Sequence, residues 1–141
     1  MRRINYGRMI LSGIIIGVIV DIVEGLLNGW LIADQWEAAL AAIGKPPFVV
    51  TDIIAFNVYG LIVGIMCAWI YAGFRPRFGA GHRTAILAAL TTWVLGYFLV
   101  NATIVIMGAA PFGLMLIVAV VGLVEIIVAS LVGNYFYRED A

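Results

Sequence analysis

Four long apolar stretches dominate the chain, and short polar segments separate them. The stretches cover residues 10–32, 49–71, 84–107 and 114–136. A helix needs about 20 consecutive apolar residues to cross the hydrocarbon core of a bilayer, and each stretch is long enough. Little chain remains outside them, so a separate soluble domain has no room. The pattern therefore predicts an all-α, polytopic membrane protein, a single domain over residues 1–141 with four transmembrane helices.

Composition supports this class. The chain has 141 residues, of which 65% are hydrophobic and 11% charged, and its mean hydropathy is +1.12. Soluble chains are about 45–50% apolar and about 25% charged. The net charge is zero and the basic residues adjoin the apolar stretches, so nothing supports nucleic-acid binding. The lipid bilayer is the expected partner.

Basic residues are concentrated on one side of the predicted membrane. The two outer connections hold only Lys45, whereas seven arginines flank the other helix ends. These arginines are Arg2, Arg3, Arg8, Arg75, Arg77, Arg83 and Arg138. Basic loops stay in the cytoplasm, so both termini and the 72–83 connection are expected there. Because the first stretch contains two acids and continues to Ile32, we expect a retained helix rather than a cleaved signal peptide.

A short helix is predicted between the first two stretches. Asp34 and Glu37 have the spacing of a capping box, and apolar residues follow at helical spacing. Gly44 and the prolines after it would end the segment. Such a helix fits on the outer membrane surface as an interfacial anchor; a lid or a partner-docking element is the functional alternative.

Connection lengths predict which helices are neighbours. The link over residues 108–113 is so short that the third and fourth helices must be antiparallel neighbours. The first two stretches are joined by a longer segment, so they need not pack closely.

Carboxylates inside the apolar stretches are the main functional signal, since no lysine or arginine lies at their depth. A charge at the bilayer centre costs roughly 2.5–3.5 kcal/mol. We therefore expect these acids to be protonated, hydrogen-bonded to Asn or Thr, or bound to a cation. Asp52 lies near the outer interface and is the least informative. The expected polar cluster is Asp21, Glu24, Glu125, Asn28, Asn57, Asn101 and Asp52.

Small and polar residues share helix faces. Three- and four-residue spacings place the polar residues of the first helix on the same face as two glycines, which let another helix approach. The expected packing glycines are Gly13, Gly17, Gly60, Gly64 and Gly122. The acids and amides fall in the middle and outer half of the spans. One polar pocket that opens outward is the simplest arrangement.

Other chemistry is missing from the sequence. His82 is the only histidine and Cys67 the only cysteine, so we expect no metal site, haem or other cofactor. Cys67 is interpreted as small apolar packing. Trp93 and Tyr97 could face a cofactor, but packing against neighbouring helices is the preferred interpretation. Paired carboxylates could do general acid–base work, but no nucleophile or second catalytic group is recognisable, so an enzyme is not the preferred interpretation.

The sequence resembles a domain-of-unknown-function family of small four-helix bacterial membrane proteins. The resemblance rests on Gly29-Trp30 and Trp36, on residues 93–97, and on the glycine-rich fourth stretch. It implies a bacterial inner-membrane location but no activity. Small multidrug-resistance transporters also have four helices and an acid in the first. They are shorter, and their dual-topology members have balanced loop charges, which this chain does not.

Three classes of function follow as hypotheses, of which the third is a membrane enzyme or a lipid-binding protein. Acids on packing faces at mid-membrane depth favour proton- or cation-coupled transport or a channel-like role. Four helices barely enclose a pathway, so transport would require a homo-oligomer. In the alternative, the polar seam serves helix association in a non-catalytic accessory or assembly subunit of a larger membrane complex. The substrate or ion is not specified by the sequence.

Overall fold

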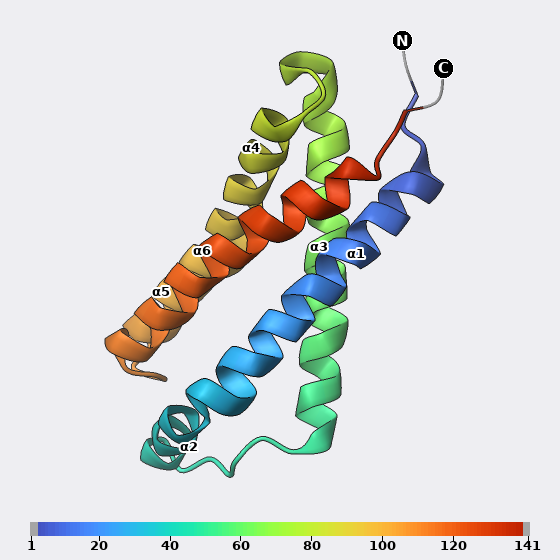
Figure 1. The fold of residues 1–141 in the computed structure, drawn as a ribbon. Coiled ribbons are helices and arrows are strands. Elements are labelled where there is room, and N and C mark those ends of the chain that lie inside the picture. The colour runs from blue at the N-terminus through green and yellow to red at the C-terminus, as the bar shows by residue number, and fades with distance from the viewer. Residues whose placement is uncertain (1–2, 140–141) are drawn as a thin grey trace.

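The computed structural model describes residues 3–139, and these residues form an all-α bundle (Figure 1). Four helices are long and apolar enough to cross a membrane, namely Tyr6–Leu31, Val50–Phe78, His82–Ile106 and Phe112–Tyr135. The all-α class and the number of long apolar helices are therefore confirmed. The helical segments are α1 (Tyr6–Leu26), the π-helical turn η1 (Leu27–Leu31), α2 (Ala33–Ala42), α3 (Val50–Phe78), α4 (His82–Trp93), the π-helical turn η2 (Val94–Phe98), α5 (Leu99–Ile106) and α6 (Phe112–Tyr135).

Helix α3 is longer than predicted. It continues past residue 71 to Phe78, so Arg75 and Arg77 lie in its last turns and not in a loop. Basic side chains suit this position because the helix dipole is negative at the C-terminus. Gly79 then ends the helix with a φ of 81°, a left-handed conformation that glycine adopts without strain.

Helix α2 occupies the segment where a short helix was predicted, but the predicted capping box is wrong. The N-cap is Ile32, and no side chain caps the helix. The reason is that η1 leads almost directly into α2, with only Ile32 between them, so Asp34 falls inside the first turn. The helix ends at Ala42, and Gly44 follows with a φ of 71°.

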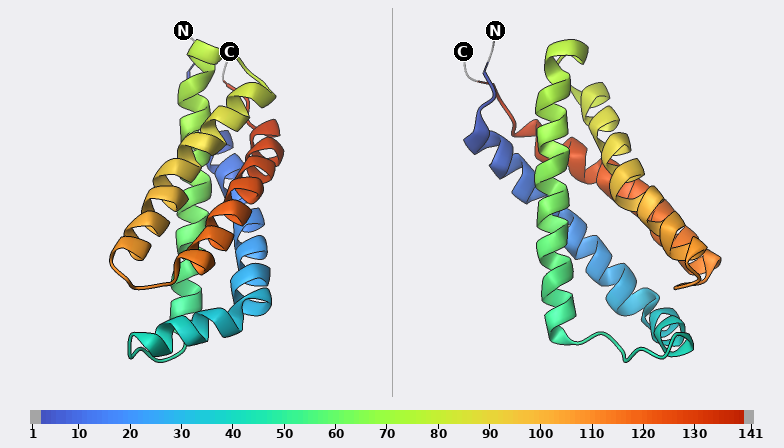
Figure 2. Two further views of the ribbon diagram at one scale, coloured as in Figure 1. Left: turned by 90° about the vertical axis from the view of Figure 1, so that its left-hand side faces the viewer. Right: turned by 180° about the vertical axis from the view of Figure 1, so that it is seen from behind.

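The two ends of the bundle are distinct. The chain termini and the α3–α4 connection lie at one end, here called the termini end (Figure 2). Helix α2 and the α5–α6 connection lie at the other, here called the α2 end. The antiparallel pairing of α4 and α5 with α6 confirms the prediction made from the short link between them.

The expectation that the first two long helices need not pack closely is wrong. Helix α1 packs more extensively against α3 than against any other element. The cause is a set of glycines at the crossing. A Cβ on Gly17 would lie 2.7 Å from the Cα of Leu61, and one on Gly64 would overlap the backbone of Gly13 and Gly17. Close backbone approach of this kind needs small residues on both helices.

Helix α3 diverges from α5 toward the α2 end. It packs on α1 and α4, whereas α5 packs on η2 and α6 (Figure 2). The termini half of the bundle is filled with side chains that have no exposed surface, among them Ile16, Cys67, Ala88 and Ile126. An open space is therefore expected only in the α2 half.

Candidate functional site

A cavity of about 620 Å³ lies between α1, α3 and the η2–α5 segment, in the α2 half of the bundle. Trp36 of α2 and Phe48 of the following segment also line it. The structure brings five of the predicted cluster residues to its wall. These are Asp21, Glu24, Asn28, Asn57 and Asn101.

Glu125 adjoins the cavity without lining it. Its side chain is 4% exposed, and its Oε1 accepts a hydrogen bond of 2.7 Å from the hydroxyl of Tyr97, which lines the cavity. The carboxyl groups of Glu24 and Glu125 lie beside each other. Helices α1 and α6 therefore each contribute one acid to a pair, called here the acid pair.

A second set of hydrogen bonds connects the acid pair to α2. The side-chain amide of Asn28 donates to Oε2 of Glu24 and also to its backbone carbonyl. The indole N–H of Trp36 donates to Oδ1 of Asn28 at 2.8 Å. Helix α2 is thus joined to Glu24 through one amide side chain.

One oxygen of each acid has no donor. Within the described residues, Oε1 of Glu24 and Oε2 of Glu125 are buried and accept no hydrogen bond from any N–H or O–H group. An ionised carboxylate can only accept, so two facing carboxylates repel unless a proton or a cation lies between them. One proton or one cation between the two carboxylates would remove this repulsion.

Two glycines make room for the side chains of this site. A Cβ on Gly60 would overlap the carboxylate of Asp21, and one on Gly122 would lie 2.5 Å from the ring of Tyr97. Both glycines were predicted to lie at helix-packing positions. In the structure both glycines accommodate site residues, and Gly60 also lies with Gly13, Gly17 and Gly64 at the α1–α3 crossing.

The π-helical turns are a feature that the sequence analysis missed. Asn28 lies in η1 and Tyr97 in η2, and each turn contains a glycine followed by an aromatic residue. A π-turn inserts one residue per turn, so it rotates the side chains that follow and frequently marks a functional site. The pairs Gly29-Trp30 and Gly96-Tyr97 are the only sequence signal we can connect with it.

Asp52 lies outside the cavity. Its Oδ2 accepts a 2.9 Å hydrogen bond from the backbone N–H of Val49, which places a carboxylate at the N-terminus of α3. The structure therefore gives Asp52 a role in starting the helix. Asn57 lines the cavity, and its amide donates to the carbonyl of Ile53 in its own helix.

Polar side chains also meet near the termini end, which the sequence analysis did not expect. Ser12 donates to Oδ1 of Asn134 at 3.0 Å, and the amide of Asn134 donates to Ser130 at 2.9 Å. Ser130 in turn donates to the carbonyl of Ala85 at 2.8 Å. The amides are therefore not confined to the middle and α2 half. All three side chains are buried and hydrogen-bonded, so we assign this cluster to helix packing.

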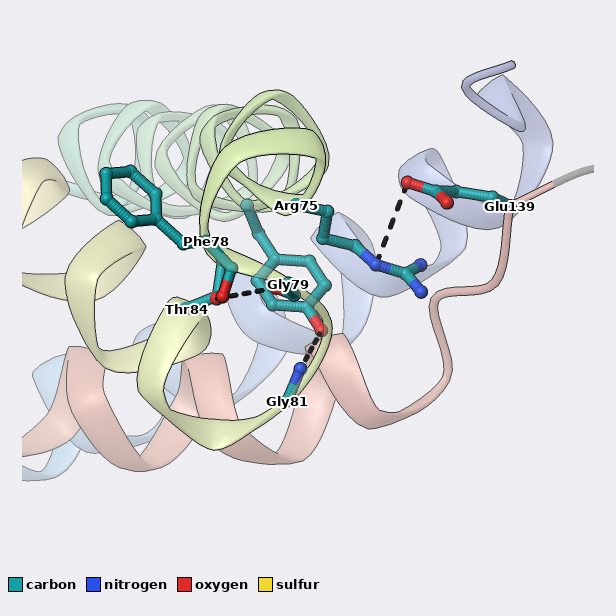
Figure 3. A network of polar contacts seen from close by, with 7 residues as sticks. Arg75, Phe78, Gly79, Gly81, Thr84 and Glu139 are labelled. Atoms are coloured by element: carbon teal, nitrogen blue, oxygen red, sulfur yellow. Dashed lines mark hydrogen bonds and ion pairs between the residues drawn. The ribbon is translucent and has the colours of Figure 1, made fainter. Parts of the chain in front are cut away.

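Arg75 is largely enclosed by the segment that follows α6 (Figure 3). Its Nε lies 3.7 Å from a carboxylate oxygen of Glu139, and its guanidinium lies 5.1 Å from the ring centre of Tyr137. Nearby, Tyr71 accepts a hydrogen bond from the backbone N–H of Gly81, inside the α3–α4 connection. These contacts join the C-terminal segment to the end of α3.

Comparisons of this chain with protein-family models, with curated proteins and with solved structures found no match. The resemblance to a domain-of-unknown-function family therefore stays a prediction.

Proposed function

We propose that this chain is an integral protein of the bacterial inner membrane, with both termini and the α3–α4 connection in the cytoplasm and α2 on the outer surface. Support comes from the length and apolarity of the four long helices. The distribution of charge agrees, since Arg8, Arg75 and Arg83 lie at the termini end and Lys45 follows α2 at the other end.

Within that setting, we propose that the protein carries out proton- or cation-coupled transport. The observation that carries this function is the meeting of Glu24 and Glu125 beside a cavity. In the described part of the chain, no lysine, arginine or histidine lines that cavity. Intramembrane acids that face a cavity rather than lipid are typical of ion and proton pathways.

The residues around the acid pair have separable roles in this function. Tyr97 occupies one oxygen of Glu125 by hydrogen bonding, and Asn28 occupies one of Glu24. The two remaining oxygens hold a single proton between them, and a cation in the cavity replaces that proton. This exchange of the proton for the cation couples the movement of the two ions.

The packed termini half of the bundle closes the pathway on the cytoplasmic side. Ile16 of α1 and Ile126 of α6 have no exposed surface there, and a Cβ on Gly133 would overlap Ile16. The structure, with its cavity in the α2 half and its packed termini half, therefore corresponds to one state of the transport cycle. Separation of α1 from α6 would open the other side, and a second copy of the chain would complete the enclosure.

Flux measurements in proteoliposomes test this function. With an imposed proton gradient, we expect proton movement that falls to the level of empty liposomes in Glu24→Gln and Glu125→Gln. The matched control is Glu37→Gln, an exposed acid on α2 that should keep the flux. Unchanged flux in both pair variants would contradict transport, and co-purification of a larger complex would then favour the accessory-subunit alternative.

A further inference from the structure

Much of the cavity wall outside α1 is aromatic. The ring of Phe48 lies between those of Trp36 and Phe56. Its centre is 5.9 Å from that of Trp36 and 5.4 Å from that of Phe56. Tyr59 and Tyr97 complete the aromatic lining from α3 and η2. The rings come from four separate elements, so the fold and not a single helix assembles them.

The charged side chains that line the cavity are all acidic. Asp21 and Glu24 line it from α1, and the buried Glu125 lies directly behind. No basic side chain among the described residues lines the cavity, so these acids have no internal counter-charge. An anion or an anionic lipid headgroup would be repelled. A cation would meet carboxylates on one side and the faces or edges of rings on the other.

The size of the cavity favours an organic cation over an inorganic one. Its volume of about 620 Å³ is within the range of roughly 300–1,000 Å³ that holds small organic ligands. A hard metal ion needs a compact shell of oxygen ligands, about six to eight for calcium. The described residues contain no group of three or more His, Cys, Asp or Glu that could hold a metal ion.

The cavity also has an apolar approach from the side. Its lining includes Ile53 on α3 and Val100 on α5, which are 52% and 42% exposed, and these two helices diverge toward the α2 end (Figure 2). In the proposed topology, this side of the cavity faces the acyl chains of the outer leaflet. A ligand with an apolar part can enter there while its charged group moves toward Glu24.

From these observations we infer that the cavity binds an amphipathic organic cation, with its charged group between Glu24 and the aromatic wall and its apolar part toward the α3–α5 opening. The inference rests on the proposed function, because it names the cation that exchanges with the proton of the acid pair. Binding should therefore release a proton.

Two ions of the same shape and opposite charge provide the test. Equilibrium binding of tetraphenylphosphonium and of tetraphenylborate should be measured on the purified protein in detergent micelles, with empty micelles subtracted. We expect saturable binding of tetraphenylphosphonium, accompanied by release of about one proton into weakly buffered solution. We expect no saturable binding of tetraphenylborate. Saturable binding of both ions, or of neither, would overturn the inference.

Paired variants locate the bound cation. Glu24→Gln should weaken tetraphenylphosphonium binding at least about tenfold, because it removes a charged partner, and Glu37→Gln should not. Phe56→Leu should weaken it about 3- to 30-fold through lost cation–π contact, whereas Phe112→Leu, at the start of α6 and outside the cavity, should leave it unchanged. Equal affinities within either pair would overturn the placement.

The failure of this inference can be told apart from the failure of the proposed function. Proton flux that depends on Glu24 and Glu125, without saturable tetraphenylphosphonium binding, would overturn the organic cation and leave transport standing. Saturable binding with proton release but no flux would support the ligand and contradict transport.

Discussion

Glycines decide where two helices and two site residues can lie in this bundle. Gly64 brings α3 against the backbone of α1, and Gly60, one turn away, leaves the space that the Asp21 carboxylate fills. Gly122 does the same for the ring of Tyr97, which holds Glu125. The glycine pattern in the sequence predicted close contact. It could not predict whether a backbone or a side chain would fill each space, because that depends on how the helices cross.

Alanine substitutions at two glycines of α3 should separate packing from helix propensity. In Gly64→Ala the new Cβ meets the backbone of α1, which cannot move independently, so we expect a loss of about 1–3 kcal/mol in unfolding free energy. In Gly73→Ala nothing lies within 4 Å, so stability should be unchanged or rise by up to about 1 kcal/mol. Unfolding in mixed detergent micelles measures both; equal stabilities would contradict the close α1–α3 crossing.

At the scale of elements, the π-turns and α2 set the geometry of the site. Hydropathy predicted the four long helices, because length and apolarity are local properties. The π-turns were not predicted, since their backbone differs from an α-helix by one residue per turn and leaves no periodic signal. Consequently the hydrogen bonds from Tyr97 to Glu125 and from Trp36 to Asn28 were not foreseen, although all four positions were noted.

The hydrogen bond between α2 and η1 predicts how firmly α2 is held. Trp36→Phe keeps a ring that can pack on Phe48 but removes the N–H that Asn28 accepts from. A net hydrogen bond is worth about 0.5–1.5 kcal/mol, so amide hydrogen exchange within α2 should become about 2- to 10-fold faster. Trp69→Phe, an exposed position on α3, serves as the control and should leave α2 unchanged. Identical α2 exchange in Trp36→Phe would show that this bond does not hold the helix.

For the whole molecule, one part of the helix arrangement follows from a short connection in the chain, and another part follows only from how the helices pack. The short α5–α6 link determined one antiparallel pair in advance. The α1–α3 crossing did not follow from connection length, because helix packing is determined by surface shape and not by the chain between the helices. The cavity follows from the divergence of α3 and α5, which is a property of the assembled bundle.

Labelling from one side of the membrane tests the proposed topology. Cys67 is buried and is the only cysteine, so Cys67→Ala gives a background for single cysteines at Ile43, after α2, and at Ala80, in the α3–α4 connection. In cells whose inner membrane is intact, a membrane-impermeant maleimide cannot reach the cytoplasm. It should label position 43 and leave position 80 unlabelled until the inner membrane is opened. The reverse pattern would contradict the positive-inside assignment.

The proton shared by Glu24 and Glu125 is the claim on which the functional account depends. Infrared difference spectroscopy on the protein in bilayers at neutral pH, without organic or divalent cations, measures it directly. We predict the C=O band of a protonated carboxyl, lost or shifted in both Glu24→Gln and Glu125→Gln and unchanged in Glu37→Gln. Spectra in which every carboxyl is ionised under these conditions would contradict the account.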